Sequence, residues 1–286
     1  YMNQLPKKIV SVLQTPFDET NKIDFASFEK LINESIAAGV NGFLCPVVAS
    51  EVSFLSDPER SQFIKFVKVV QPKVPIIIGA SSDKIETCRQ FALQAIDSKA
   101  DAYLVAVPGE CYEKLESIIP FFKNVSKGID LPLVIQDFQF NGPGMSLEII
   151  QKLKQEIPTL VGLKIETQPS GPKYTAVKNS CGANFWVAGG WAITQMIEAL
   201  DRGVDAMIPE SSMVKVYSKI YQLFSTGNRN QALELFRKLQ PVLMFSNQDV
   251  GTSIAFFKRL LVAKGIFKTP NMRLPGFEWD EYNVRI

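Results

Sequence analysis

The chain has 286 residues, of which 46% are hydrophobic and 21% are charged, proportions that suit a soluble protein with one large domain and a sizeable core. Its 31 basic and 29 acidic residues give a formal net charge of +2 and form no basic stripe, which argues against a nucleic-acid partner. Histidine is absent, which excludes His-based nucleophile triads, His metal sites and imidazole acid–base chemistry.

Eight apolar runs of strand length recur along the chain. They are continuously apolar rather than alternating, which is typical of strands buried on both faces of a parallel sheet. They cover residues 9–14, 42–47, 75–80, 102–107, 131–137, 160–166, 185–189 and 206–209.

Amphipathic helical patterns lie between these runs. One begins at Asp24, a second is predicted to begin with Asp57 as N-cap and Pro58 as the first helical residue, and a third begins at Ser146. A further helix is expected over residues 192–200. Alternating strands and helices of this kind predict an α/β protein with a (β/α)8 TIM barrel.

After the eighth apolar run the pattern is helical only, over residues 214–224, 231–244 and 254–263. We therefore expect a catalytic barrel over residues 2–225 and a small C-terminal helical appendage over residues 226–286.

The four cysteines show no Cys-x-x-Cys spacing, and we expect them to be reduced thiols packed inside a cytoplasmic protein. The apolar runs fall far short of the roughly 18–20 residues that a membrane helix needs, and no signal peptide is recognised. The sequence therefore predicts no membrane partner.

A lysine, Lys164, lies inside the apolar run at residues 160–165, two residues before Glu166. Side chains two apart on a strand point the same way, so both are expected to face the barrel interior. A buried amine can lose its charge and become a nucleophile for ketones, while a nearby carboxylate moves protons. An interior ion pair without a catalytic role is the alternative interpretation.

In such barrels the active site lies at the carboxyl ends of the strands. The ends of the second, fifth and seventh strands supply the turn Val48-Ala49-Ser50, the pair Gln136-Asp137 and the pair Gly189-Gly190. Backbone amides at Gly189 have room to reach a small anion, although glycine at a strand end is also typical of a plain tight turn.

Several motifs, taken in order, resemble the dihydrodipicolinate synthase and N-acetylneuraminate lyase superfamily of class I, Schiff-base barrels. They span nearly the whole chain and comprise Thr15-Pro16-Phe17, Gly39-Val40-x-Gly42, Glu51 with Leu55-Ser56-x-x-Glu59-Arg60, Gly162-Leu163-Lys164, Lys258-x-x-Leu261-x-x-x-Gly265 and Arg273-x-Pro275. The resemblance implies that Lys164 is the Schiff-base residue, that the substrate is a small 2-keto acid, that no separate cofactor is needed, and that the protein is a homo-oligomer, a dimer or tetramer.

The sequence also departs from that family. Where the family has Gly-Thr-Thr-Gly-Glu, this chain has Val47-Val48-Ala49-Ser50-Glu51, and Gln136 stands where the family has a proton-carrying tyrosine. An arginine expected a few residues later is missing as well. These changes argue against a true dihydrodipicolinate synthase.

The Lys164-Ile165-Glu166 segment resembles the 2-keto-3-deoxy sugar-acid dehydratase branch more closely, in which a glutamate two residues after the lysine is thought to replace the tyrosine. The resemblance implies that Glu166 is the acid–base and that Val48, Ala49, Ser50 and Gln136 bind the substrate. Because histidine is absent and the tyrosine is replaced, Asp137 is the main rival for the acid–base role, and Gly189 is expected to bind the substrate through its backbone. We expect a dehydratase or an aldolase acting on a 2-keto-3-deoxy sugar acid.

Three alternatives stay open at this point. They are dihydrodipicolinate synthase itself, a non-catalytic 2-keto-acid binder, and a metal-dependent barrel with Glu51, Asp137 and Glu166 as ligands. No metal site is expected in the leading interpretation.

Overall fold

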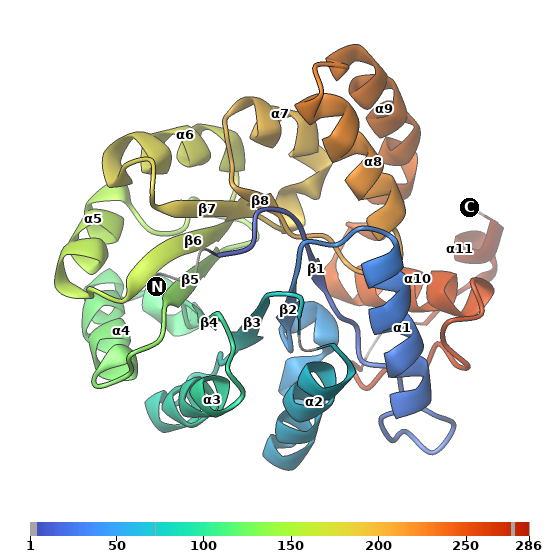
Figure 1. Cartoon of the computed structure of the whole chain (residues 1–286), viewed down its shortest axis with the longest axis horizontal. Coiled ribbons are helices and arrows are strands. Elements are labelled where there is room, and N and C mark those ends of the chain that lie inside the picture. Colours follow the sequence, from blue (N-terminus) through green and yellow to red (C-terminus); the bar gives the residue numbers. More distant parts are fainter. Residues whose placement is uncertain (1–4, 72, 276–277, 286) are drawn as a thin grey trace.

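The computed structural model describes residues 5–71, 73–275 and 278–285, so residues 2–4 of the predicted barrel lie outside the described part. Eight strands close into a parallel barrel in the order β1 to β8, each paired with its neighbour in sequence, and β8 pairs with β1 (Figure 1). The (β/α)8 barrel predicted from the sequence is confirmed.

The strands follow the predicted apolar runs to within a few residues. They are β1 Lys8–Val12, β2 Gly42–Cys45, β3 Ile76–Gly79, β4 Ala102–Ala106, β5 Leu133–Phe138, β6 Leu160–Glu166, β7 Trp186–Gly189 and β8 Ala206–Met207.

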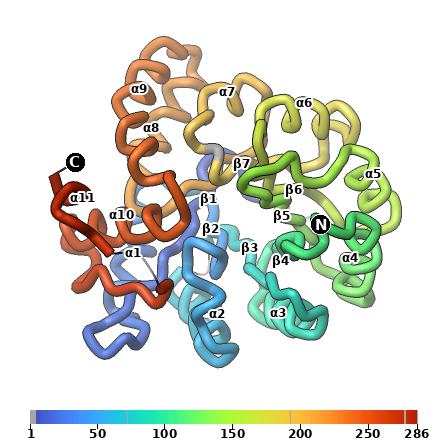
Figure 2. Tube along the Cα trace, turned by 180° about the vertical axis from the view of Figure 1, so that it is seen from behind, coloured from blue at the N-terminus to red at the C-terminus, as the bar shows by residue number. Residues whose placement is uncertain are grey.

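The helices surround the barrel, as both views of the chain show (Figures 1 and 2). They are α1 Phe25–Ala37, α2 Asp57–Val70, α3 Ile85–Asp97, α4 Ile118–Ser126, α5 Leu147–Glu156, α6 Ser170–Cys181, α7 Met196–Asp201, α8 Val214–Ser225, α9 Arg229–Ser246, α10 Val250–Ala263 and α11 Glu281–Arg285.

Helix starts follow local capping chemistry. Asp24 and Ser146 cap α1 and α5 as predicted, each accepting hydrogen bonds from backbone N–H groups of the first turn. The predicted N-cap Asp57 is wrong: Ser56 caps α2 and forms a capping box with Glu59, which leaves Asp57 as the first helical residue.

The predicted helix at residues 192–200 is also only partly correct. It begins as a 3₁₀ turn, Trp191–Gln195, and becomes α-helical only at Met196. This tight turn directly follows the carboxyl end of β7, so it brings backbone groups of Trp191 to the top of the barrel.

Two apolar layers hold the barrel together. Inward-facing side chains such as Val10, Leu44, Leu104, Val134 and Ala188 fill the interior, and a larger layer packs between the strands and the helices. The interior layer is completely apolar up to the level of Lys164, so polar side chains enter the barrel only near the carboxyl ends of the strands.

The C-terminal helices extend the barrel on one side. Helix α8 packs on β1 as the eighth barrel helix, α9 packs on α7 and α8, and α10 reaches the turn after β2. The boundary expected at 225/226 follows the end of α8, and the division into separate domains stays a prediction. No helix in the described part of the chain combines the length and apolarity needed to cross a membrane.

Candidate active site

Lys164 and Glu166 face the barrel interior side by side on β6. The Lys164 Nζ lies 3.0 Å from Glu166 Oε1, and their side chains are 5% and 6% exposed. Both point inward because Gly162, Lys164 and Glu166 share one face of the strand, while Leu163 and Ile165 pack outward against helices. The structure therefore places a lysine and a carboxylate in one buried space.

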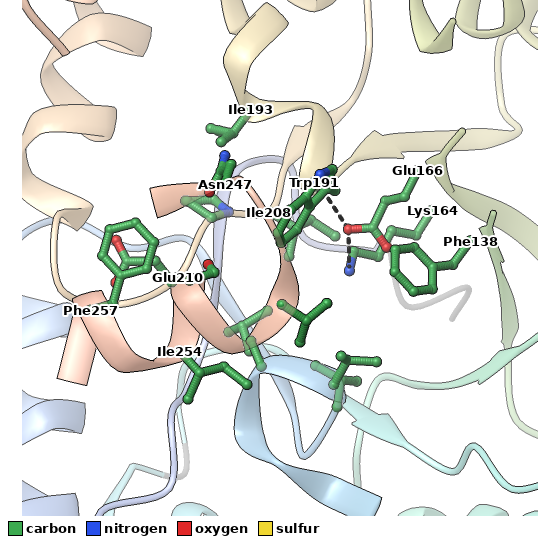
Figure 3. Close-up of a pocket in the computed structure, with 18 of the residues that line it drawn as sticks. Phe138, Lys164, Glu166, Trp191, Ile193, Ile208, Glu210, Asn247, Ile254 and Phe257 are labelled. Carbon is green, nitrogen blue, oxygen red and sulfur yellow. Dashed lines mark hydrogen bonds and ion pairs between the residues drawn. The ribbon is translucent and has the colours of Figure 1, made fainter. Parts of the chain in front are cut away.

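The Glu166 carboxylate accepts hydrogen bonds from three structural elements. Besides Lys164 on β6, the backbone N–H of Trp191 donates to Oε1 at 2.5 Å (Figure 3). Gln136 Nε2 on β5 donates to Oε2 at 2.5 Å. Both carboxylate oxygens are thus held by donors, and the orientation of the group relative to Lys164 is fixed.

Gly190 allows this arrangement because it has no side chain. A Cβ at position 190 would lie 2.0 Å from Glu166 Oε1 and 2.5 Å from Lys164 Cε, distances that non-bonded atoms do not adopt. The glycine is therefore required for the close approach of the β7 end to the Lys164–Glu166 pair.

A cavity opens above this pair at the carboxyl ends of the strands. Lys164, Glu166, Gln136, Glu210, Asn247 and Ser253 are its polar lining residues. The rest of the lining is mainly apolar and includes Val12, Val47, Phe138, Trp191, Ile193, Ile208, Ile254 and Phe257. A mostly apolar cavity with a few convergent polar groups is typical of a small-molecule site.

The turn after β2 contributes two of its three predicted binding residues to the cavity. Val48 and Ala49 line it, whereas Ser50 is completely buried outside the lining. The Ser50 hydroxyl donates to the Leu13 carbonyl at 2.6 Å and accepts from the Val47 N–H at 3.1 Å. The expectation that Ser50 offers a hydroxyl to the substrate is corrected, because that hydroxyl is committed to the backbone.

Gly189, which the sequence predicts to bind an anion through its backbone, is not among the residues that line the cavity, and its backbone role stays a prediction. It faces away from the cavity, since a Cβ there would meet the Tyr174 hydroxyl and Met207. Its neighbour Gly190 lines the cavity instead. The alternation of a strand accounts for the difference, because Ala188 and Gly190 share the inner face.

Asp137, the expected rival of Glu166, points out of the barrel. It accepts hydrogen bonds from the Tyr112 hydroxyl at 2.8 Å and the Met145 N–H at 3.0 Å, and it forms an ion pair with Lys173. Burial and the neighbouring Asp137 raise the pKa of Tyr112, which therefore stays a hydrogen-bond donor. Asp137 organises the loop after β5 and has no access to the cavity.

Glu210, which the sequence reasoning left out of the site, lines the cavity just after β8. Its Oε2 accepts hydrogen bonds from Gln14 Nε2 at 3.1 Å and from the backbone N–H of Ser212. Burial raises the pKa of this carboxyl. The signal was its position two residues after the inward-facing Ile208, which places both side chains on the same face.

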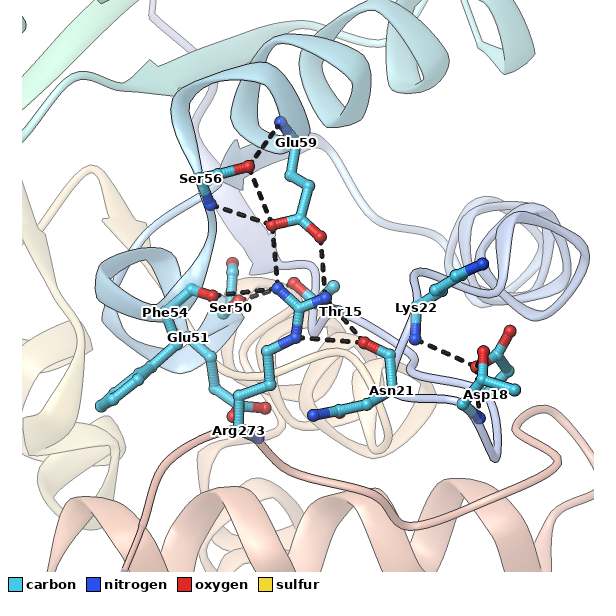
Figure 4. Close-up of polar contacts among 11 residues, drawn as sticks. Thr15, Asp18, Asn21, Lys22, Ser50, Glu51, Phe54, Ser56, Glu59 and Arg273 are labelled. Atoms are coloured by element: carbon cyan, nitrogen blue, oxygen red, sulfur yellow. Dashed lines mark hydrogen bonds and ion pairs between the residues drawn. The ribbon is translucent and has the colours of Figure 1, made fainter.

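A buried ion-pair network anchors the turn after β2 to the C-terminal region. Lys258 on α10 pairs with Glu51, whose other oxygen accepts from the backbone N–H groups of Arg273 and Leu274 at 2.6 and 2.8 Å. The Arg273 guanidinium in turn contacts Glu59 (Figure 4). This network fixes the position of the turn that carries Val48 and Ala49.

The metal-dependent alternative finds no support in this geometry. Of the three proposed ligands, Glu51 lies in the network with Lys258, Asp137 lies outside the barrel, and Glu166 alone faces the cavity. Within the described ranges, no group of three or more acidic, Cys or His side chains is placed to hold a metal ion.

Comparison with known proteins identifies the family of this chain. The model of the dihydrodipicolinate synthetase family matches residues 5–283. The chain is 27% identical over 243 residues to a 4-hydroxy-tetrahydrodipicolinate synthase of Bartonella bacilliformis, covering 82% of this chain and 81% of that protein. It is 28% identical over 287 residues to the protein of the same name from Bdellovibrio bacteriovorus, covering 97% and 94%.

Solved structures show the same fold. A dihydrodipicolinate synthase from Rhodopseudomonas palustris matches with a TM-score of 0.89 at 21% identity, covering 100% of this chain and 96% of that one. A 4-hydroxy-tetrahydrodipicolinate synthase from Methylacidiphilum fumariolicum matches with a TM-score of 0.87 at 18% identity, covering 98% and 92%. The chain belongs to the dihydrodipicolinate synthetase family, whose members are class I lyases that form a lysine Schiff base with pyruvate.

Proposed function

We propose that Lys164 forms a Schiff base with the C2 carbonyl of a 2-keto acid. The observation that carries this proposal is the placement of the Lys164 amine, 3.0 Å from Glu166, at the floor of a mostly apolar cavity. The neutral amine attacks C2, and the carbonyl oxygen leaves as water after proton transfers that Glu166 can mediate. The resulting iminium is a cation that can absorb electrons from C3.

The substrate carboxylate is proposed to bind at Val48 and Ala49. Their side chains line the cavity, and the turn that carries them is held by Thr15, whose hydroxyl donates to the Ser50 carbonyl at 2.6 Å. Backbone N–H groups at such a turn bind an anion without needing particular side chains. This accounts for a binding role that survives the loss of the family's threonines.

Glu166 is proposed to be the acid–base of the following step. It removes a proton from C3, which gives an enamine, and the conjugate acid then protonates the C4 hydroxyl as that group leaves as water. Gln136 and the Trp191 N–H hold the carboxylate in place through both transfers. Hydrolysis of the remaining imine frees Lys164 and releases a dehydrated 2-keto acid.

We propose a 2-keto-3-deoxy sugar acid as the substrate, because it carries the C4 hydroxyl that this sequence of steps eliminates. Aldol cleavage is the other outcome of the same intermediate: removal of the C4 hydroxyl proton breaks the C3–C4 bond and yields pyruvate and an aldehyde. Both reactions use Lys164 and Glu166, and the products distinguish them.

Tetrahydrodipicolinate synthesis is the second candidate, favoured by the names of the relatives. It is weakened by Gln136, which stands at the position of the family's tyrosine and has an amide that does not carry protons. A non-catalytic 2-keto-acid binder would use the same cavity without turnover.

A turnover screen tests the proposal. The protein is incubated with 2-keto-3-deoxy acids, and pyruvate and dehydrated 2-keto acids are both measured, with pyruvate plus aspartate semialdehyde as the comparison. We expect dehydration or cleavage that persists in excess chelator, since the proposed chemistry needs no metal or added cofactor. Condensation with aspartate semialdehyde as the preferred reaction would contradict the proposal. Sedimentation in the same buffer tests the proposed dimer or tetramer.

A further inference from the structure

The cavity is lined by more acidic than basic side chains, and this imbalance affects which substrates it can bind. Among the described lining residues, Lys164 is the one basic side chain, while Glu166 and Glu210 are both acidic. Lys164 is paired with Glu166 and, in the proposed function, is consumed by the Schiff base. The rest of the cavity therefore offers no cation to a second anionic group on the substrate.

Glu210 lies across the cavity from Lys164 and Glu166 (Figure 3). Its Oε2 is bound by Gln14 and by the Ser212 N–H, whereas its Oε1 is shielded from solvent and accepts no hydrogen bond from the described residues. A buried carboxyl oxygen without a partner is costly unless a ligand supplies one. Because water does not reach this oxygen, Glu210 contributes to the cavity wall as an acidic group and adds no positive charge to it.

The surroundings of Glu210 do not supply a positive charge to the cavity. Lys264 is the nearest cation that influences Glu210, but its Nζ donates to the Ser212 carbonyl at 2.6 Å outside the lining. Tyr217, the other titratable group beside Glu210, is neutral because burial raises its pKa well above the usual value. The apolar lining residues of the same cavity include Ile193, Ile208, Ile254 and Phe257, and an apolar lining strengthens the interaction between unpaired charges.

A neighbouring hollow at the ends of β3 and β4 does contain Arg60 and Lys84, together with Asp57 and Asp83. The Arg60 guanidinium lies 3.7 Å from the centre of the Phe91 ring and donates to the carbonyls of Gly79 and Ser81. These contacts direct the two terminal nitrogens of the Arg60 guanidinium toward backbone carbonyls and away from the cavity that Lys164 lines.

We propose that the cavity selects 2-keto acids whose C1 carboxylate is their only charge, and that Glu210 disfavours a second anion on the distal part of the substrate. Phosphorylated substrates and substrates with a second carboxylate are excluded, because their additional anion would lie in an apolar space beside a carboxyl group. The inference rests on the proposed Schiff base and names the substrate class of that same site.

Trapping with borohydride measures this selectivity without requiring turnover. The adduct at Lys164 is quantified by mass spectrometry against the concentration of each probe. The probes form two matched pairs: 2-ketovalerate with 2-ketoglutarate, and 2-keto-3-deoxygluconate with its 6-phosphate. We expect the singly charged member of each pair to half-saturate at a concentration lower by about tenfold or more, the size of a like-charge penalty in an apolar site.

Variants test whether Glu210 causes the preference for singly charged probes. Glu210→Gln is expected to narrow the difference within each pair, and Glu210→Lys to reverse it. Asn247→Lys, which adds a cation at a half-buried polar position of the cavity lining, gives the same reversal if the substitution at 210 prevents folding. Glu148→Gln, which removes an exposed carboxylate on α5, is the matched control and should keep the wild-type preference.

Equal or tighter trapping of the phosphorylated and dicarboxylate probes by the wild-type protein would overturn the inference. An unchanged preference in both Glu210→Gln and Asn247→Lys would overturn it as well. Failure of every probe, pyruvate included, to give an adduct would instead refute the proposed function on which the inference rests.

Discussion

The amide of Gln136 donates its hydrogen bond to Glu166 Oε2 at 2.5 Å, from the neighbouring strand β5. In the related family a proton-carrying tyrosine stands at position 136, so the amide occupies the place of the acid–base group and instead orients a carboxylate. We propose that the acid–base role is thereby moved from β5 to β6, onto Glu166, two residues from the proposed nucleophile.

This relationship predicts the effect of removing the amide. Gln136→Leu keeps the side-chain volume near that of glutamine but leaves Glu166 Oε2 without its donor. Turnover should fall by about 10- to 100-fold, the equivalent of one hydrogen bond to a charged group, while Schiff-base trapping persists. Steady-state kinetics of the purified variant check this, and wild-type turnover would show that Gln136 does not orient Glu166.

A substitution at Glu166 should separate Schiff-base formation from the dehydration that follows it. Glu166→Gln is expected to trap pyruvate at Lys164 but to lose dehydration by roughly 10²–10⁴-fold, the usual contribution of a positioned acid–base group. Single-turnover measurements follow the two stages separately. Near-normal dehydration would transfer the role to Glu210 or to water, since Asp137 faces away from the cavity.

Gly190 gives a steric prediction with a matched control. Gly190→Ala would place a methyl group 2.0 Å from Glu166 Oε1, so the carboxylate or the β7 end must shift. We expect activity to fall by about 100-fold, because small displacements at a catalytic site have effects of this order. Gly109→Ala, where a Cβ meets nothing within 4 Å, should retain activity. Equal activities of the two variants would contradict the close packing described for the site.

The Glu59–Arg273 pair predicts an acid-sensitive contribution to stability. The Arg273 guanidinium, which donates to Glu59 at 2.7 and 2.8 Å, lowers the pKa of that carboxyl from 4.5 to about 2. Because the folded pKa is the lower one, the pair stabilises the fold above about pH 4.5 and loses this contribution as the pH falls toward 2.

Glu59→Gln tests the sign of this effect. The variant should be less stable than the wild type by about 1 kcal/mol or less at neutral pH, since the pair is partly exposed and screened. The difference in the free energy of unfolding should shrink between pH 4.5 and 2. Urea unfolding at a series of pH values measures it, and a difference that grows as the pH falls would contradict the assignment.

Much of the barrel and the central pair could be predicted from the sequence. Continuous apolar runs located all eight strands, and the two-residue spacing of Lys164 and Glu166 placed them on one face. These features depend on local periodicity, which a sequence displays directly.

The rest of the site depends on information that periodicity does not contain. The N–H of Trp191 binds Glu166, and a backbone donor has no signature in the sequence. The hydroxyl of Ser50 turned toward Leu13 because the chain forms a tight 3₁₀ turn there. The cap of α2 differs from these features, because the sequence does display it. Ser56 and Glu59 have the three-residue spacing of a capping box, which predicts Ser56 as the N-cap.

Trapping of the proposed Schiff base tests the central claim most directly. The protein is incubated with pyruvate and borohydride, and the peptide that contains Lys164 is examined by mass spectrometry. A reduced pyruvate adduct is expected on Lys164 in the wild type and in Lys173→Arg, which alters the buried lysine paired with Asp137 outside the barrel. Lys164→Arg should give no adduct. A wild-type protein that stays unmodified, or an adduct that persists in Lys164→Arg, would contradict the assignment of Lys164 as the nucleophile.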